Sequence, residues 1–245
     1  KRWAKALGLS QKRYRKLLAV LRADSGIIEN YLRQKDYTFD YAKLPAQAMF
    51  KYRQAFGRGD ASRYAGYLEQ VKHGQAVLKT GTLYPYEIIR PCFKTQVTAE
   101  ERQVLEATWQ SLPDYAAGEN ALVVMDGSGS MYSWQNGEPA MVALSLAIYF
   151  AQRAKGVFHN HFITFSEHPR LVEVKGQDIW EQVRYCATFN EAANTDLQAV
   201  FTLLLRTACK HRLTQADLPQ SVYVVSDMEF DGCAANASVT HFEQA

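Results

Sequence analysis

The sequence predicts an α/β fold with a doubly wound, mostly parallel sheet, preceded by an all-α segment. From residue 119 onward, short apolar strand patterns alternate with helical patterns, which is typical of a parallel sheet covered by helices on both faces. Residues 1–118 instead show apolar side chains at helical spacing, and no strand pattern competes there. We therefore expect two domains, residues 1–118 and 119–245, with a linker at 112–118.

The composition is that of an ordinary globular protein, with 245 residues, 47% of them hydrophobic and 22% charged. No apolar run reaches the ~18–20 residues of a membrane span, and no signal-like segment opens the chain. The four cysteines are scattered, unlike those of a zinc site or a secreted disulfide scaffold. We therefore expect a cytoplasmic protein with reduced thiols and no membrane partner. Because the chain begins at Lys1 without a methionine, we also expect it to be a piece of a longer protein.

Charge divides the chain in the same way. Residues 1–119 carry 20 Lys and Arg against 12 Asp and Glu, a net charge of +8, whereas residues 120–245 carry 8 against 13, a net charge of −5. The two halves therefore differ in kind, and the first could attract an anionic partner.

Six helices are predicted in the first half, each from a capping or helix-starting residue followed by apolar residues at helical spacing. They begin near Ser10, Ile27, Pro45, Asp60, Pro85 and Thr98. Gly57 is expected to end the third helix and Asp60 to cap the fourth. The aromatic residues, 14 Tyr and 12 Phe, mostly follow the same spacing, so we expect them in the core and not as platforms for stacking bases.

The first of these helices is strongly basic and amphipathic. Leu17 and Leu21 belong to its apolar face, and the other faces are crowded with Lys12, Arg13, Arg15 and Lys16. Such cations could contact phosphates without reading a base sequence. A charged face that is simply solvated is the alternative.

In the second half, strands are predicted at 121–126, 161–165, 171–174 and 221–226. Helices are predicted from about Pro139, over 177–186, and after Thr195.

The segment Asp126-Gly127-Ser128-Gly129-Ser130 directly follows the first strand and places three oxygen-bearing side chains at i, i+2 and i+4. Ligands of parallel sheets bind beyond the carboxyl ends of the strands. Mg²⁺ takes oxygen ligands at about 2.0–2.1 Å and keeps several waters, so one or two carboxylates with neutral hydroxyls suit it. We expect the two glycines to let the backbone turn tightly. A Gly/Ser turn without a ligand is the alternative.

Two later residues favour the metal site. Thr195 stands just before a predicted helix and could add a third hydroxyl, and Asp227 closes another buried strand. Two carboxylates and three hydroxyls would then meet at one edge of the sheet.

The order Asp126, Ser128, Ser130, Thr195, Asp227 resembles the metal-ion-dependent adhesion site of von Willebrand factor type A domains, which are Rossmann-like, over roughly residues 119–245. The resemblance implies that the serines and the threonine bind Mg²⁺ or Mn²⁺ directly and that the aspartates act largely through bound waters. One coordination position is left open for a carboxylate of a protein partner. Type A domains usually carry two more strands after the one ending in Asp227, so we expect a sheet without its last strands.

A basic helical segment ahead of such a domain resembles the Ro autoantigen family, whose helical-repeat (TROVE, HEAT-like) module and type A domain bind small non-coding RNAs. Segments 44–48, 84–89 and 225–231 resemble an uncharacterised family with the same architecture more closely. By this likeness, residues 1–118 would be the end of a TROVE-like module. Its RNA contacts would come from Lys12, Arg13, Arg15 and Lys16.

We therefore expect a binding protein and not an enzyme, in which Mg²⁺ is presented to an acidic group of a protein partner. The alternative is a Ro-like RNA-binding protein. A metal-dependent hydrolase comes third, because no general base is apparent. A serine-hydrolase elbow would need glycine where Asp126 stands. His159 and His161 share a strand face without an evident third ligand, so we expect a surface or packed pair.

Overall fold

The computed structural model describes residues 2–133, 136–190 and 196–227. The chain forms two compact units, Lys1–Thr80 and Gly81–Ala245, and each is considered by itself. Within the described ranges, no helix is both long and apolar enough to cross a membrane.

The first unit is helical, as the sequence predicts. Ser10 accepts a hydrogen bond from the backbone N–H of Arg13 at 3.3 Å and so caps the second helix as expected. A short 3-10 turn, Tyr41–Lys43, connects the third and fourth helices. The helices of this unit are α1 (Arg2–Ala6), α2 (Gln11–Asp24), α3 (Ile28–Gln34), α4 (Ala46–Gly59) and α5 (Ala61–Lys72).

Aromatic rings form the core of the first unit. The members of this cluster are Phe39, Tyr41, Phe56, Tyr64 and Tyr67, and their contacting ring centroids lie 5.1–5.7 Å apart. These are the distances of edge-to-face and offset aromatic pairs. The prediction that these aromatic residues belong to the core is confirmed.

Two features at the end of α4 differ from the prediction in detail. The helix continues through Gly57, because Phe56 is fully buried and holds this turn in the core. At Gly59, a Cβ would overlap the Tyr37 hydroxyl, so a larger residue there would displace this side chain. Asp60 stands at the N-cap position of α5 as predicted, but its side chain makes no capping hydrogen bond; its carboxylate accepts one from the Tyr41 hydroxyl at 2.9 Å instead.

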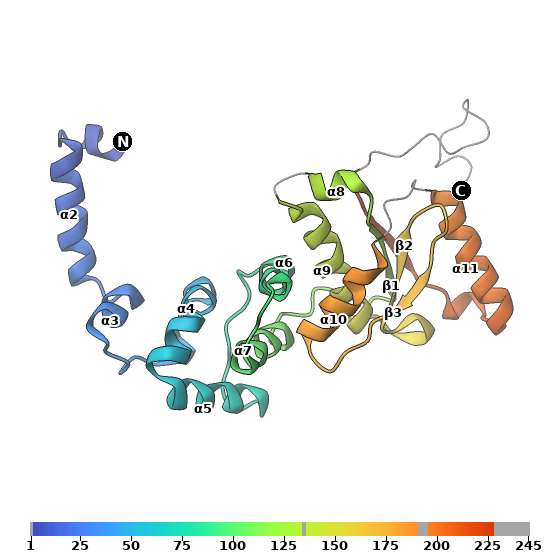
Figure 1. Cartoon of the computed structure of the whole chain (residues 1–245), viewed down its shortest axis with the longest axis horizontal. Coiled ribbons are helices and arrows are strands. Elements are labelled where there is room, and N and C mark those ends of the chain that lie inside the picture. Colours follow the sequence, from blue (N-terminus) through green and yellow to red (C-terminus); the bar gives the residue numbers. More distant parts are fainter. Residues whose placement is uncertain (1, 134–135, 191–195, 228–245) are drawn as a thin grey trace. The chain divides into compact units, whose positions relative to one another are not determined.

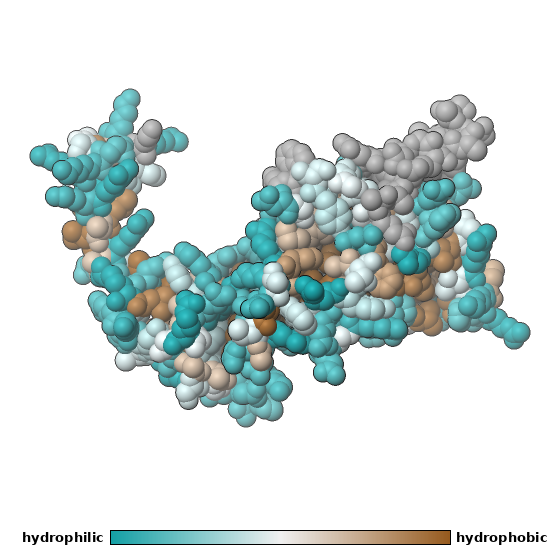
Figure 2. All heavy atoms as spheres, viewed as in Figure 1, coloured by the Kyte–Doolittle hydropathy of each residue, from teal (hydrophilic) through white to brown (hydrophobic). Residues whose placement is uncertain are grey.

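Helix α2 buries none of its residues. Its apolar side chains Leu17 and Leu21 are 40% and 56% exposed. Hydrophilic residues cover most of the rest of this helix (Figure 2). The helix forms as predicted, but the described chain does not cover its apolar face.

The second unit contains six α-helices and four strands within the described residues. The helices are α6 (Pro85–Ile89), α7 (Ala99–Gln110), α8 (Gly129–Ser133), α9 (Glu138–Arg153), α10 (Ile179–Cys186) and α11 (Leu197–His211). The strands are β1 (Ala121–Asp126), β2 (His161–Phe165), β3 (Leu171–Glu173) and β4 (Ser221–Val225). Short 3-10 turns lie at Arg90–Phe93, Gly156–Phe158, Ala187–Phe189 and Gln215–Asp217.

The four strands form one sheet in the order β3-β2-β1-β4. Strand β1 pairs in parallel with both β2 and β4, and β3 runs antiparallel to β2. The predicted α/β class, with a mostly parallel sheet behind a helical segment, is confirmed. The carboxyl ends of β1, β2 and β4 meet at one edge, as the predicted site requires.

Helices lie on both sides of this sheet (Figure 1). Leu122 and Val124 of β1 pack with Leu197, Val200 and Leu204 of α11 on one face. The alternate residues of β1 point to the other face, where α9 packs along the strand.

Helices α6 and α7 also belong to the second unit, because they pack against α9 and α10. Trp109 of α7 is fully buried, and its indole N–H donates to Gln152 Oε1 of α9 at 2.7 Å. Arg102 of α7 donates to Asp178 and Glu181, each at 2.7 Å. The packing boundary at Thr80–Gly81 therefore precedes the change of sequence pattern at 118–119.

Candidate metal site

Asp126 is the last residue of β1 and lies at the carboxyl edge of the sheet. It pairs in register with Phe165, the last residue of β2, and the neighbouring pair Met125 and Val225 brings in the end of β4. The carboxyl group is buried, since Asp126 is only 1% exposed. A buried carboxylate is costly unless hydrogen bonds or a cation compensate for its lost hydration.

The Gly/Ser segment that follows folds back onto this carboxylate. The backbone N–H of Ser128 donates to Oδ1 of Asp126 at 2.8 Å. The Ser128 and Ser130 hydroxyl oxygens lie 3.0 Å apart, within hydrogen-bonding distance of each other. The structure thus brings together the first three of the predicted metal ligands.

The local conformation differs from the expected tight glycine turn. Gly129 begins the short helix α8, and neither glycine of the motif has a positive φ. A Cβ at Gly129 would meet no atom within 4 Å. The hydroxyls are therefore placed by the start of a helix, which Ser133 supports by donating to the carbonyl oxygen of Gly129 at 3.0 Å.

Ser226 is a residue of this cluster that the sequence did not single out. It follows β4, and its hydroxyl donates to Oδ2 of Asp126 at 2.5 Å. Asp126 therefore accepts one hydrogen bond on each carboxylate oxygen. The sequence feature that could have identified Ser226 is its position directly before Asp227, on a strand predicted to end beside Asp126.

The other two predicted ligands differ in how far the structure describes them. Asp227 is exposed and follows Ser226 at the same edge of the sheet. Thr195 lies outside the described residues. The neighbouring Asp196 caps α11, because its Oδ1 accepts a hydrogen bond from the Ala199 N–H at 3.0 Å.

Tyr132 and Asn190 flank the site and were also missed. Partial burial raises the pKa of the Tyr132 hydroxyl, the negative charge of Asp126 raises it further, and a side-chain hydrogen bond with Asn190 opposes the rise. The influence of Asp126 places Tyr132 within electrostatic reach of the buried carboxylate. A tyrosine on α8 and an amide at the end of the α10 segment thus extend the polar edge.

The donor set fits a hard cation. In an octahedral shell with oxygens at about 2.1 Å, two adjacent ligands lie about 3.0 Å apart, because they subtend a right angle at the metal. The Ser128 and Ser130 oxygens have this separation, 3.0 Å. Carboxylates and hydroxyls also suit Mg²⁺ or Mn²⁺ better than a softer metal that prefers thiolate or imidazole.

The two histidines considered in the sequence do not extend a metal site. Nδ1 of His159 lies 2.9 Å from the carbonyl oxygen of Ala154, and Nδ1 of His161 lies 2.7 Å from that of His159. Among the described residues, no three His, Cys, Asp or Glu side chains are grouped as metal ligands.

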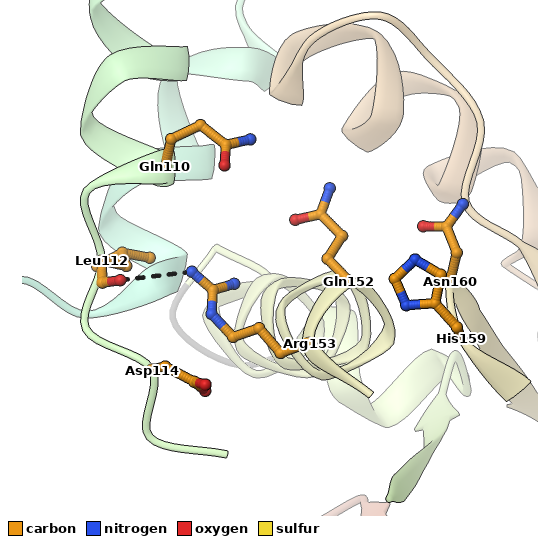
Figure 3. Close-up of a pocket in the computed structure, with 7 residues that line it drawn as sticks. All are labelled: Gln110, Leu112, Asp114, Gln152, Arg153, His159 and Asn160. Carbon is orange, nitrogen blue, oxygen red and sulfur yellow. Dashed lines mark hydrogen bonds between the residues drawn. The ribbon is translucent and has the colours of Figure 1, made fainter. Parts of the chain in front are cut away.

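A polar pocket lies at the opposite edge of the sheet, where β2 begins (Figure 3). The Arg153 guanidinium donates to the carbonyl oxygens of Tyr149 and Leu112 at 3.3 and 3.5 Å. Asn160 donates to the carbonyl oxygen of Val174 at 2.8 Å. These contacts give the pocket a structural role. Its lining residues are Gln110, Leu112, Asp114, Gln152, Arg153, His159 and Asn160.

The predicted RNA contacts lie on α2 in the first unit. Lys12, Arg13, Arg15 and Lys16 are all exposed, and none forms an ion pair with another described residue. The unit Lys1–Thr80 carries 17 Lys and Arg against 6 Asp and Glu, a net charge of +11, whereas residues 81–245 carry 11 against 19, a net charge of −8. The compact units are therefore even more unlike in charge than the halves of the sequence.

Together, the fold and this edge define a mixed α/β protein with an oxygen-rich cluster where its parallel strands end. Residues 120–245 match a family described as Domain of unknown function (DUF7788), and the chain belongs to this family. Residues 4–117 match a second family, described as Domain of unknown function (DUF2828).

The chain also resembles Uncharacterized protein L728 of Acanthamoeba polyphaga mimivirus, with 27% identity over 255 residues. The aligned region covers 97% of this chain and 43% of the viral protein. The chain thus spans less than half the length of this relative. No solved structure matches this chain.

Proposed function

We propose that this protein binds Mg²⁺ or Mn²⁺ at the carboxyl edge of its sheet and presents the ion to an acidic group of a protein partner. Asp126, Ser128, Ser130 and Asp227 would hold the ion, with Thr195 as a fifth ligand. When bound, the ion would supply a positively charged coordination position that a carboxylate can occupy. The likeness to von Willebrand type A domains motivates this assignment.

One observation carries the proposal. Two serine hydroxyls lie 3.0 Å apart beside a carboxylate that is 1% exposed. The two hydroxyls, which lie within hydrogen-bonding distance of each other, also have the spacing of adjacent metal ligands, and with the carboxylate they supply the oxygen donors that a hard cation takes. The hydrogen bonds on Asp126 also support a binding role over catalysis, because they hold the carboxylate in place instead of leaving it free to take a proton.

Calorimetric titration of the protein with Mg²⁺ tests the metal site. We expect the wild type to release or absorb heat on binding, and Asp126→Ala and Asp126→Asn to lose that signal. Asn keeps the volume of the side chain and removes its charge. Asp217→Ala is the matched control, because this partly exposed carboxylate hydrogen-bonds with Thr214 away from the site, and its loss should leave the titration unchanged. The same trace for the wild type and for both Asp126 variants would contradict the proposal.

We also propose a cytoplasmic setting for this activity, as the scattered cysteines of the sequence suggest. Cys92, Cys186 and Cys209 form no disulfide within the described part of the chain, and the first two are buried.

A second candidate function, binding of a small non-coding RNA, is favoured by the charge of the first unit. Its net charge of +11 and the four exposed cations of α2 would attract phosphates. In this proposal, the helical unit would contact RNA as the Ro family does.

A gel-shift assay with a small structured RNA at increasing salt tests this candidate. We expect wild-type binding to weaken as salt rises, and reversal of Lys12, Arg13, Arg15 and Lys16 to glutamate to weaken it at every salt concentration. Losing four phosphate contacts would lower the slope of log affinity against log salt by about 3. Reversal of Lys43 and Lys51, which already pair with Asp40 and Glu29, is the control. No shift at low salt would exclude RNA binding by this surface.

A further inference from the structure

Ser166 lies at the same edge of the sheet as the candidate metal site. It directly follows β2, whose last residue Phe165 is the register partner of Asp126. Ser166 therefore stands one position beyond the level of Asp126, on the neighbouring strand. The two strands are about 5 Å apart. It is only 1% exposed.

The Ser166 hydroxyl has no hydrogen-bond partner among the described residues. The other buried serine and threonine hydroxyls that the structure describes in this unit have partners. Thr108 donates to the carbonyl oxygen of Val104 at 2.7 Å, Ser145 donates to that of Val142 at 2.8 Å, and Thr164 accepts from the N–H of Arg170 at 2.9 Å. A buried hydroxyl without a partner is unfavourable, so native structures provide one, often an ordered water.

The position of Ser166 in the strand pattern indicates which way its side chain points. Ile163 and Phe165 belong to the core cluster on the α11 face. Continuing the alternation of β2 places Ser166 on the opposite face, that of α9. Helix α8, which carries Ser130, packs against α9. Ser166 thus lies on the α9 side of the sheet, where α8 and its Ser130 also lie. The Asp126 side chain, which shares the face of Leu122 and Val124 in the alternation of β1, lies on the α11 side.

Burial alone does not distinguish Ser166, because Oδ1 of Asn120 is also buried without a partner. Asn120, however, precedes β1 and lies at the opposite edge of the sheet. Ser166 therefore differs in combining an unpartnered hydroxyl with a position at the carboxyl edge of the sheet, on the strand that pairs with the end of β1.

We propose that Ser166 is a positioning residue of the metal site, whose hydroxyl hydrogen-bonds a water molecule held by the ion. This inference rests on the proposed function. Mg²⁺ retains several of its waters in protein sites, and groups that hydrogen-bond the ligands fix their orientation. Ser166 would contribute no direct bond to the metal, which distinguishes it from Ser128 and Ser130.

The test is Mg²⁺ binding by the full chain, measured by calorimetry and by the rise in melting temperature on adding Mg²⁺. We expect Ser166→Ala to bind Mg²⁺ about tenfold more weakly, the lower end of the effect of outer partners on metal affinity. Without metal, its melting temperature should equal or exceed that of the wild type, since the substitution removes an unsatisfied group. Ser145→Ala is the matched control, because Ser145 is equally buried, and its Mg²⁺ affinity should stay within twofold of the wild type.

Three results would overturn this inference in distinguishable ways. If wild-type protein binds Mg²⁺ and Ser166→Ala binds it within twofold as tightly, only the role of Ser166 fails. If Ser166→Ala and Ser145→Ala lose affinity equally, the effect is one of packing and the role also fails. If the wild type does not bind Mg²⁺, the proposed function fails with it. Should Ser166→Ala not fold, Ser166→Cys retains the shape of the side chain with a somewhat larger atom and a weaker donor, and it should show the same loss of affinity.

Discussion

Trp109 provides a direct test of where the second unit begins. Its indole is fully buried on α7 and donates to Gln152 of α9 at 2.7 Å. Gln152 donates in turn to Gln182 of α10 at 2.8 Å. Helix α7 is thus connected to two helices of the sheet unit, although the sequence pattern assigned it to the first domain. Substitution of Trp109 should therefore destabilise the sheet.

The size of the effect follows from burial and from the lost hydrogen bond. Truncation of a buried aromatic side chain to alanine costs about 3–5 kcal/mol, so we expect Trp109→Ala to lower the free energy of unfolding of the second unit by about 4 kcal/mol. Trp109→Phe keeps most of the apolar volume but leaves Gln152 Oε1 without its donor, which costs about 1–3 kcal/mol. At an m-value of about 2 kcal/mol/M, these losses lower the urea midpoint by about 2 M and about 1 M.

Urea denaturation of the full chain, followed by circular dichroism and by tryptophan fluorescence, measures these shifts. Trp3→Phe is the control, because Trp3 is 70% exposed and its substitution should change the free energy by less than about 0.5 kcal/mol. If Trp109→Ala unfolds at the wild-type midpoint, α7 is not part of the cooperative sheet unit and the reasoning is refuted.

Two further predictions concern titratable side chains. Burial raises the pKa of the Cys186 thiol to about 12. At pH 8, iodoacetamide should therefore label the exposed Cys209 and spare the buried Cys186 and Cys92. Equal labelling rates for all three, measured by peptide mass spectrometry, would contradict this prediction. Burial also raises the pKa of Tyr41 and of Tyr67, the latter to about 12, and the hydrogen bond to Asp60 raises that of Tyr41 further. The folded state therefore favours the neutral hydroxyls, and their contribution to stability is complete below about pH 10 and is lost as the pH rises toward 12. The helical circular dichroism signal of the first unit should decrease in that range. No loss of stability up to pH 12 would show that the aromatic core does not depend on neutral tyrosines.

The strands could be predicted because each is a short apolar run with clear ends. β1 and β2 cover the expected residues 121–126 and 161–165. The end of α4 could not, since the choice between Gly57 and Gly59 depends on where Phe56 and Tyr37 lie in space. The role of Asp60 likewise depends on Tyr41, 19 residues away, whose hydroxyl competes with the backbone for its carboxylate. Local signals mark where a helix can end, and tertiary packing decides where it does.

The candidate site was predictable to the extent that its chemistry is local in sequence. Asp126, Ser128 and Ser130 follow one strand, and their proximity comes from the turn between them. Ser226 and Ser166 were not distinguishable from other serines, because their significance comes from strand pairing that brings their ends beside Asp126. Thr195 stays a prediction, since it lies outside the described residues.

The two hydrogen bonds on Asp126 differ greatly in the length of chain that each must close. The bond from Ser128 spans two residues, whereas the bond from Ser226 spans 100. During synthesis, the first can form as soon as β1 and its turn have left the ribosome, but the second requires about a hundred further residues and the docking of β4. The second hydrogen bond on the Asp126 carboxylate therefore forms only after β4, the last described strand to be synthesised, has paired with β1.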